Sequence, residues 1–288
     1  MADPRRRPPP RALDFSLEEV CLLTLVHTLS SGSSGNALLL SCGESHILLD
    51  AGISCRRITA ALRDLGLEPS SLSAILITHT HADHIAGLQT LLKRCGAPVF
   101  ATWRTVRDLA WRLSDTDDRL IPLDTGSPQE MGPFMVTAFP TSHDALGSCG
   151  FRLDTADGAV GVLTDTGYVT DEAADILPGV DLAVLEANHD VETLRSGPYP
   201  YSLKQRILGA QGHLSNADAG RFAAVLAEGG ASEIVLAHLS QENNTPAMAL
   251  SAVEEALSAA GLSPLLSVAP RDCLGPAHMV CRRSVCRK

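Results

Sequence analysis

The sequence predicts a single α/β domain, on three observations. The chain has 288 residues, of which 45% are hydrophobic and 19% charged; this is enough apolar material for one large core and excludes a disordered chain. Short apolar runs alternate with helical patterns along the chain. No internal repeat or linker divides it. We therefore expect one domain over residues 17–270, between a disordered Pro/Arg-rich tail at 1–16 and a basic tail at 271–288.

The apolar runs and the helical patterns give the expected order of elements. Strands are predicted, in chain order, at 20–26, 37–41, 46–49, 74–78, 98–102, 134–139, 150–153, 159–163, 182–185 and 233–237. Helices are predicted at 56–65, 85–94, 103–113, 217–227 and 246–259. The last two have recognisable starts: Ser215 with Asp218 resembles a capping box, and Thr245 before Pro246 places an N-cap ahead of a first-turn proline.

Charge narrows the classes of function. The net charge is −10 although both ends of the chain are basic, so the body between them is more acidic than the total. Such a body is a poor general binder of nucleic acid, and phosphates would need a local basic patch or metal ions that offset the carboxylates.

Hydropathy and cysteine spacing indicate the compartment. No apolar run reaches the roughly 18 residues that a membrane span needs, so we expect no membrane segment. The eight cysteines are scattered without a CxxC pair, which favours reduced thiols and a cytoplasmic location over a disulfide framework. A small metal site at Cys273, Cys281 and Cys286 is the less favoured alternative.

Polar residues stand where predicted strands end. Strand ends that lead into loops are where α/β proteins build sites, because the sheet fixes the positions and the loops give access. Six apolar runs end abruptly in histidine or a carboxylate: LLD at 48–50, LITHTHADH at 76–84, FPTSHD at 139–144, LTDTG at 163–167, LEANHD at 185–190 and LAHLS at 236–240.

The segment HTHADH at 79–84 carries the sharpest chemical signal. Residues two apart in an extended chain point the same way, so His79 and His81 can bind one metal ion. If a helix starts near Asp83, then Asp83 and His84 turn toward a second ion nearby.

This segment resembles the HxHxDH signature of the metallo-β-lactamase superfamily. The other positions of that signature follow in order, with Asp50 before the segment and His143, Asp165 and His238 after it. The resemblance covers about residues 20–265 and implies a four-layered αββα sandwich with a two-metal site between the sheets.

The resemblance also implies the ligand set. His79, His81 and His143 would hold one divalent ion and Asp83, His84 and His238 the other, with Asp165 bridging them. These nitrogen and oxygen ligands suit zinc or manganese, and also iron. Asp50 is expected to orient a ligand imidazole or the metal-bound water, although a turn aspartate before Gly52 is the alternative.

Further segments resemble the YycJ/WalJ branch, whose members are regarded as 5′-to-3′ DNA exonucleases. They are SGSSGN at 31–36, EANHD at 186–190, YPYSLKQRI at 199–207 and GHLSN at 212–216. Two of them also resemble paired motifs of the transfer-RNA 3′-processing endonucleases, which implies that His213 is the general acid and Glu186 its orienting partner. A structural role for His213 just before a helix is the alternative.

Substrate contacts are expected in two places. The loop containing Ser34, Gly35 and Asn36 offers backbone N–H groups to phosphate oxygens, unless it is simply a flexible hairpin. Lys204 and Arg206 would contact a nucleic-acid backbone, and a solvated helix face explains them equally well.

We therefore predict a dinuclear metal-dependent phosphodiesterase, and more narrowly a 5′-to-3′ exonuclease on DNA. A hydroxide bridging the metals would attack phosphorus, with Asp83 as proton acceptor. The alternatives are a small-molecule hydrolase acting on a phosphodiester or, like glyoxalase II, on a thiolester, and a non-catalytic regulatory binding protein. The stretch between Asp165 and His238 is too short to hold the extra β-CASP domain of larger nucleases. No feature of the sequence indicates whether the protein is a monomer or an oligomer.

Overall fold

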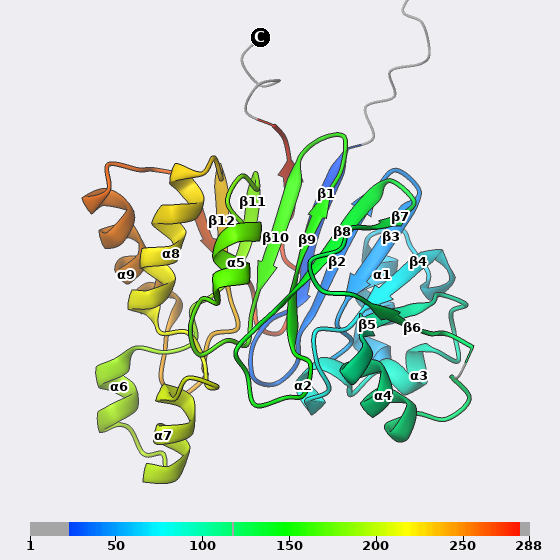
Figure 1. Ribbon diagram of the computed structural model, residues 1–288, viewed down its shortest axis with the longest axis horizontal. Helices are drawn as coiled ribbons and strands as arrows, with labels where there is room; N and C mark the ends of the chain where they lie inside the picture. Colours follow the sequence, from blue (N-terminus) through cyan, green and yellow to red (C-terminus); the bar gives the residue numbers. More distant parts are fainter. Residues whose placement is uncertain (1–22, 117, 283–288) are drawn as a thin grey trace, which may run out of the picture.

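Two β-sheets lie face to face, and helices cover their outer faces (Figure 1). The structure is a computed structural model, and it describes residues 23–116 and 118–282. The strands are β1 (Thr24–Ser30), β2 (Ala37–Cys42), β3 (Ser45–Leu49), β4 (Leu72–Leu76), β5 (Val99–Thr102), β6 (Leu120–Leu123), β7 (Gln129–Met131), β8 (Phe134–Pro140), β9 (Cys149–Asp154), β10 (Ala159–Leu163), β11 (Leu182–Glu186), β12 (Glu233–Ala237), β13 (Leu265–Val268) and β14 (Ala277–Val280). The helices are α1 (Cys55–Asp64), α2 (Ala82–Ile85), α3 (Leu88–Leu91), α4 (Trp103–Arg112), α5 (Asp171–Ile176), α6 (Val191–Ser196), α7 (Tyr201–Leu208), α8 (Asn216–Glu228) and α9 (Pro246–Ala259), with a short 3₁₀ turn at Pro69–Ser71.

The two seven-stranded sheets share one pattern of pairing. The first has the order β14-β1-β2-β3-β4-β5-β6 and the second β13-β12-β11-β10-β9-β8-β7. In each sheet the strands from one edge pair antiparallel and those at the other edge pair parallel. The parallel strands therefore all end at one edge of the sandwich, where their carboxyl ends can build a common site.

Three apolar layers hold the sandwich together. The central layer is formed by side chains of both sheets, among them Phe134, Phe151 and Val235. A second layer packs α5, α8 and α9 on one sheet, and a third packs α1, α3 and α4 on the other. Alternate residues of a strand point to opposite faces, so each sheet feeds both a central and an outer layer. The predicted four-layered αββα sandwich in a single domain is confirmed.

Helix starts follow the expected chemistry. Ser215 caps α8 by accepting a hydrogen bond from the backbone N–H of Asp218, and Thr245 caps α9 ahead of Pro246, as predicted. Asp190 and Thr170 cap the short helices α6 and α5 in the same way, although neither helix was predicted.

The predicted helix over 85–94 is wrong as one piece. The chain forms two short helices, α2 and α3, with Gly87 between them. The backbone of Gly87 lies directly against Ala51 and Ile53: its N–H donates to the Ala51 carbonyl at 2.8 Å, and a Cβ at Gly87 would lie 2.1 Å from the Ile53 carbonyl oxygen. Close packing of backbones therefore overrides the helical pattern here.

The ends of the domain also differ from the prediction. The first strand, predicted over 20–26, is observed as Thr24–Ser30, and the Pro/Arg-rich segment 1–16 lies outside the described residues. The boundary at 270 was placed too early, because β14 in the predicted basic tail pairs antiparallel with β1. The alternation of buried and exposed residues in β14 covers four positions only. His278 and Val280 are buried, and Ala277 and Met279 are exposed.

Two expectations from composition can be compared with the structure. No helix among the described residues is long and apolar enough to cross a membrane. Cys55, Cys95, Cys149 and Cys273 are free thiols, but Cys281 is disulfide-bonded, so the expectation of reduced thiols is wrong at that residue.

The packing at Gly87 predicts a specific cost for a small side chain. Because the residue has helical backbone angles, alanine is excluded by its neighbours and not by its own conformation. We expect Gly87→Ala to lower the free energy of unfolding by roughly 2 kcal/mol or more. Chemical denaturation measures this, with Gly96→Ala as the matched control because nothing lies within 4 Å of a Cβ there. Equal stability of the two variants would contradict the packing argument.

Candidate metal centre

Three residues of the predicted centre follow strands in a left-handed backbone conformation. Asp50 comes after β3, Asp165 after β10 and His238 after β12, with φ angles of 62°, 56° and 56°. Residues other than glycine rarely adopt these angles, and neighbouring contacts must hold them there. One such contact is the hydroxyl of Ser31, which accepts a hydrogen bond from the His238 N–H at 2.8 Å. The chain thus turns sharply at strand ends of both sheets, where the site lies.

The first predicted ligand group comes together as expected. His79, His81 and His143 each offer a ring nitrogen, and these atoms lie within 4.8 Å of one another. His143 Nε2 is 3.1 Å from His81 Nδ1, and His143 Nδ1 donates to the Gly212 carbonyl at 3.1 Å. That second contact fixes the His143 ring with Nε2 directed at its partners.

The second predicted group lies beside the first. His84 Nε2 and His238 Nε2 lie 3.6 and 3.5 Å from Asp83 Oδ2. Asp165 stands between the two groups, because its carboxylate is 3.2 Å from His84 Nε2 and 3.7 Å from His143 Nε2. The structure therefore brings all seven predicted ligands into one cluster, with Asp165 at its middle.

The chemistry of this cluster fits divalent cations. His79 Nε2 and His238 Nε2 are buried and have no hydrogen-bond partner among the residues that the structure describes, which costs free energy unless an ion or water satisfies them. Burial would raise the pKa of Asp165, but His238 and His84 hold it well below its usual range. Burial would likewise lower the pKa of His238, yet Asp165, Asp83 and Glu186 raise it to about 10. The buried negative charge of the carboxylates must therefore be balanced by positive charge, which two bound cations would supply.

Asp50 lies behind the ligands and holds one of them. Its Oδ2 accepts from His84 Nδ1 at 2.7 Å and from the Thr78 hydroxyl at 2.9 Å, and its Oδ1 accepts from the Thr78 N–H at 2.9 Å. His84 Nε2 is thereby left to face Asp165 and Asp83. This is the geometry of a residue that orients a ligand imidazole, as the sequence suggested.

Glu186 joins His213 to the ligand His238. One oxygen, Oε1, accepts from His213 Nδ1 at 2.8 Å and from His238 Nδ1 at 2.9 Å. The other, Oε2, accepts from the backbone N–H groups of Thr166 and Leu214. Burial would raise the pKa of Glu186, but His213 and the hydrogen bonds from both imidazoles lower it to about 2. A fully buried, ionised Glu186 therefore fixes the Nδ1 side of His213, and leaves Nε2 available.

The loop of Ser34, Gly35 and Asn36 has a different role from the predicted one. The N–H of Gly35 donates to the Gly32 carbonyl at 2.9 Å and that of Asn36 to the Asp83 carbonyl at 2.8 Å. Neither amide is available to a phosphate, so a backbone cradle is wrong at both residues. Ser34 is exposed. The Asn36 side chain lies against the centre, with Nδ2 3.1 Å from His84 Nε2.

Lys204 and Arg206 lie on α7 but face different surroundings. Lys204 Nζ donates to the Arg195 carbonyl at the end of α6, at 2.7 Å. Arg206 Nε donates to Asp144 at 2.5 Å, and the other oxygen of Asp144 is 3.4 Å from the ligand His81. Only Arg206 is linked to the metal centre.

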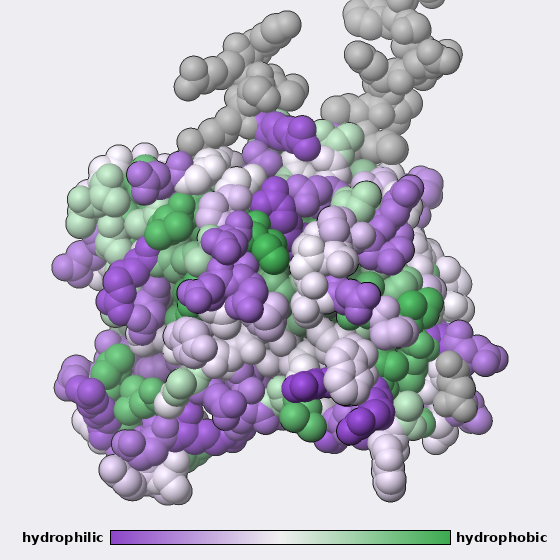
Figure 2. All heavy atoms as spheres, viewed as in Figure 1, coloured by the Kyte–Doolittle hydropathy of each residue, from purple (hydrophilic) through white to green (hydrophobic). Residues whose placement is uncertain are grey.

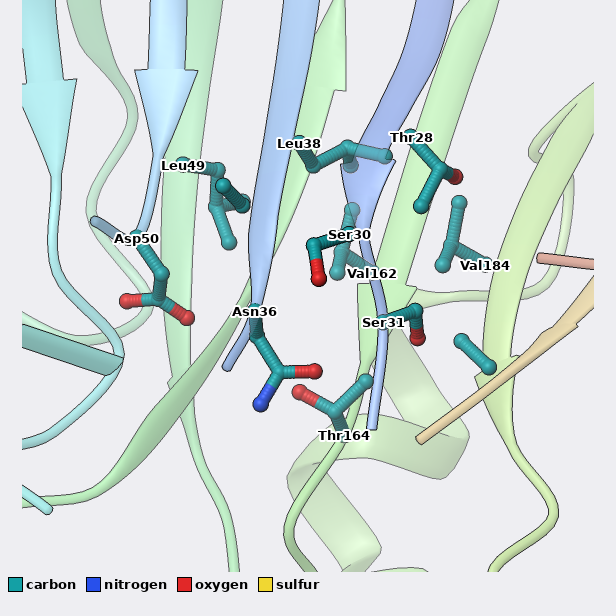
Figure 3. Close-up of a pocket in the computed structure, with 12 residues that line it drawn as sticks. Thr28, Ser30, Ser31, Asn36, Leu38, Leu49, Asp50, Val162, Thr164 and Val184 are labelled. Atoms are coloured by element: carbon teal, nitrogen blue, oxygen red, sulfur yellow. The ribbon is translucent and has the colours of Figure 1, made fainter. Parts of the chain in front are cut away.

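The spaces near the centre differ greatly in size. Figure 3 shows a small space between the sheets, lined by Asn36, Asp50 and Thr164 together with Leu38 and Leu49. Its volume of about 30 Å³ suits a buried water and not a substrate. Two open grooves of about 430 and 680 Å³ meet at Asp144 and Gln211 instead. The smaller of these two grooves is lined by His143, so it offers a substrate an open path to the first ligand group.

Sequence reasoning missed three residues that support the centre. They are Asp144 beside His81 and His143, Thr78 between Asp50 and His84, and Ser31 under His238. Each stands next to or inside one of the motifs described above, so proximity in sequence is the available signal. One partner of each is distant along the chain, namely His81 for Asp144, Asp50 for Thr78 and His238 for Ser31, and only the fold reveals these pairs.

The contacts of Asp50 predict a selective metal defect. Both of its oxygens accept hydrogen bonds, so the amide nitrogen of Asp50→Asn would face a donor in either orientation. We expect the second ion, held with His84, to bind about 10–100-fold more weakly, while the His79–His81–His143 ion is retained. Competition with a chromophoric chelator measures this, with Asp154→Asn on β9 as control. Two ions bound with unchanged affinity would contradict this role.

Comparison with known proteins agrees with the fold and with the motifs. Residues 45–239 match the model of the beta-lactamase superfamily domain. The exodeoxyribonuclease WalJ of Streptococcus pneumoniae is 39% identical over 77% of this chain and 83% of that protein. The exodeoxyribonuclease YycJ of Bacillus anthracis is 37% identical over 81% of this chain and 89% of that protein.

Among solved structures, the metallo-beta-lactamase fold protein YhfI from Bacillus subtilis has a TM-score of 0.68 at 19% identity. The match covers 89% of this chain and 99% of YhfI. This likeness supports the fold alone. From the family model and the two bacterial relatives together, the chain belongs to the beta-lactamase superfamily and, within it, to the family of WalJ and YycJ.

Proposed function

We propose that this protein is a dinuclear metal-dependent phosphodiesterase that degrades DNA as a 5′-to-3′ exonuclease. One observation carries the proposal: the seven-ligand cluster shares Glu186 with His213, so that a proton donor stands beside the two-metal site. Relatives over most of the chain are named exodeoxyribonucleases, which favours DNA as the substrate. A DNA substrate also agrees with the cytoplasmic location expected from the sequence.

Divalent ions held by this ligand set, zinc or manganese in our proposal, supply Lewis acidity and lower the pKa of the attacking water. The residues of the chain position the reaction around them. Asp83 Oδ2 is the proposed proton acceptor, because its side chain is a quarter exposed while it still lies against His84 and His238. Asp50 and Gly212 keep the ligand rings in place from behind.

His213 is the proposed donor of a proton to the leaving oxygen. Its Nδ1 is held by Glu186, which leaves Nε2 as the ring atom that would deliver the proton. The side chain of His213 is 19% exposed, so it reaches the open side of the centre. Glu186 acts through His213 and is a positioning residue.

The alternatives predicted from the sequence differ from this proposal in substrate or in the absence of catalysis. A regulatory binding protein has no need of an intact ligand cluster, which argues against that class. The acidic charge of the chain between its two basic ends agrees with a small-molecule hydrolase. That class does not account for the similarity to a protein named an exodeoxyribonuclease.

End-labelled duplex DNA tests the exonuclease proposal. With added zinc or manganese, we expect early loss of a 5′ label and late loss of a 3′ label, because a 5′-to-3′ exonuclease starts at the 5′ end. His81→Ala is the control, since it removes a ligand of the first ion and should abolish both losses. Intact DNA from protein that binds metal and hydrolyses bis(p-nitrophenyl) phosphate would instead indicate a small phosphodiester. Turnover of a thiolester alone would indicate the glyoxalase II-like alternative.

The acid role of His213 predicts a dependence on the leaving group. The p-nitrophenolate group leaves readily without a proton, whereas the sugar oxygen of DNA needs one. His213→Ala should therefore lose about 10²–10⁴-fold in DNA cleavage, much less on bis(p-nitrophenyl) phosphate, and keep both ions. Metal content and the two rates measure this. An equal loss on both substrates, or none on DNA, would rule out His213 as the acid.

A further inference from the structure

Helix α4 carries both tryptophans of the chain on its surface. Trp103 is 53% exposed and Trp111 is 90% exposed, which is unusual for the largest apolar side chain. Arg104 and Arg107 stack over Trp103, with their guanidinium carbons 5.4 and 5.7 Å from the centre of a Trp103 ring. We call these four residues the α4 surface.

The α4 surface forms one continuous face. Trp103, Arg107 and Trp111 follow at intervals of four residues, so they line the same side of the helix, while Thr105 and Leu109 are buried on the other. At 1.5 Å per residue the two tryptophans stand about 12 Å apart along the axis. Where α4 lies in Figure 1, Figure 2 shows strongly hydrophilic side chains next to paler ones.

This face is fixed to both loops that carry the first ligand group. The hydroxyls of Thr102 and Thr105 donate to the Gly147 carbonyl, at 2.7 and 3.1 Å, in the loop that follows His143. The Thr80 hydroxyl, between His79 and His81, donates to Asp108 of α4. Movement of α4 relative to the metal centre would break these hydrogen bonds.

The surface is also continuous with the groove that reaches the centre. A groove of about 380 Å³ is lined by Trp103, Arg107 and Trp111. Arg104 and Leu146 line this groove and also the neighbouring one of about 430 Å³, which contains His143. A chain bound along α4 thus has an open path to the first ligand group.

The charge of the α4 surface contrasts with the rest of the protein. The whole chain has a net charge of −10, yet neither Arg104 nor Arg107 lies within 4 Å of a carboxylate among residues 23–116 and 118–282. Arg112, by contrast, pairs with Asp108. Two guanidinium groups without ion-pair partners beside two exposed indole rings complement a chain that carries phosphates and flat bases.

We propose that the α4 surface binds the single-stranded part of the DNA substrate, with bases stacked on Trp103 and Trp111 and phosphates on Arg104 and Arg107. The inference rests on the proposed nuclease function and names how the substrate is held. Stacked DNA rises about 3.4 Å per nucleotide, so the 12 Å between the rings corresponds to about three or four nucleotides. Base stacking tolerates any sequence, which suits an exonuclease.

Tryptophan fluorescence tests the proposal directly, because the chain has only these two tryptophans. In His81→Ala protein, which should leave DNA intact, a single-stranded oligodeoxynucleotide should quench the emission. Trp103→Ala and Trp111→Ala should each weaken binding about tenfold, measured by anisotropy of a labelled oligonucleotide, and the phenylalanine variants should restore most of the affinity.

Arg104→Ala and Arg107→Ala should each reduce the salt dependence of binding by about 0.7 in the logarithmic slope. Arg221→Ala on α8 is the charge control.

The controls separate this inference from the function on which it rests. All α4 variants should hydrolyse bis(p-nitrophenyl) phosphate at the wild-type rate, because that substrate needs only the metal centre. Wild-type affinity and DNA cleavage in Trp103→Ala/Trp111→Ala would overturn the α4 proposal and leave the nuclease proposal intact. A dimer that dissociates in this double variant would overturn it too, in favour of a second copy of the chain on α4. If the wild-type protein itself shows no nuclease activity in any of these assays, the proposed function is overturned instead.

Discussion

The position of Asp165 is the constraint on which the rest of this structure depends. Its buried carboxylate lies within 4 Å of histidines that come from both sheets, so the sandwich must bring two separate sets of strand ends to one point. Such a cluster is stable only where charges are balanced and ring orientations are fixed. Asp50, Glu186 and the Gly212 carbonyl fix the rings, and bound cations would balance the charge.

The same contacts connect the metal centre to the proposed chemistry. Because one oxygen of Glu186 holds both His213 and His238, the proposed proton donor and a proposed ligand of the second ion share a single support. On the opposite side, Thr80 and Gly147 tie the first ligand group to α4. In our proposal, one hydrogen-bonded framework therefore serves substrate positioning, metal binding and proton transfer. The same framework holds the residues at strand ends that have left-handed backbone angles.

Much of this arrangement could be predicted from the sequence, since the signals were local. Apolar runs ending in HTHADH, TDTG or LAHLS contain both a strand and the polar residue that follows it, and their resemblance to the superfamily signature implies the fold and the seven residues that the structure brings together. The role of Gly87 could not be predicted, because it depends on the backbone of Ile53 more than thirty positions earlier. β14 was read as a tail because edge strands bury few residues and leave a weak pattern. The sequence does not show the hydrogen-bond partners of the Gly35 and Asn36 amides. In the fold, the Gly35 N–H donates to the nearby Gly32 carbonyl and the Asn36 N–H to the distant Asp83 carbonyl.

The central claim is a two-metal centre bridged by Asp165, and anomalous X-ray diffraction tests it most directly. Crystals of the full chain grown with zinc or manganese would be measured at the absorption edge of the added metal. The account predicts two anomalous peaks about 3.5–4 Å apart, one at His79, His81 and His143 and one at Asp83, His84 and His238, with Asp165 contacting both. A single peak, or two peaks that Asp165 does not join, would contradict it.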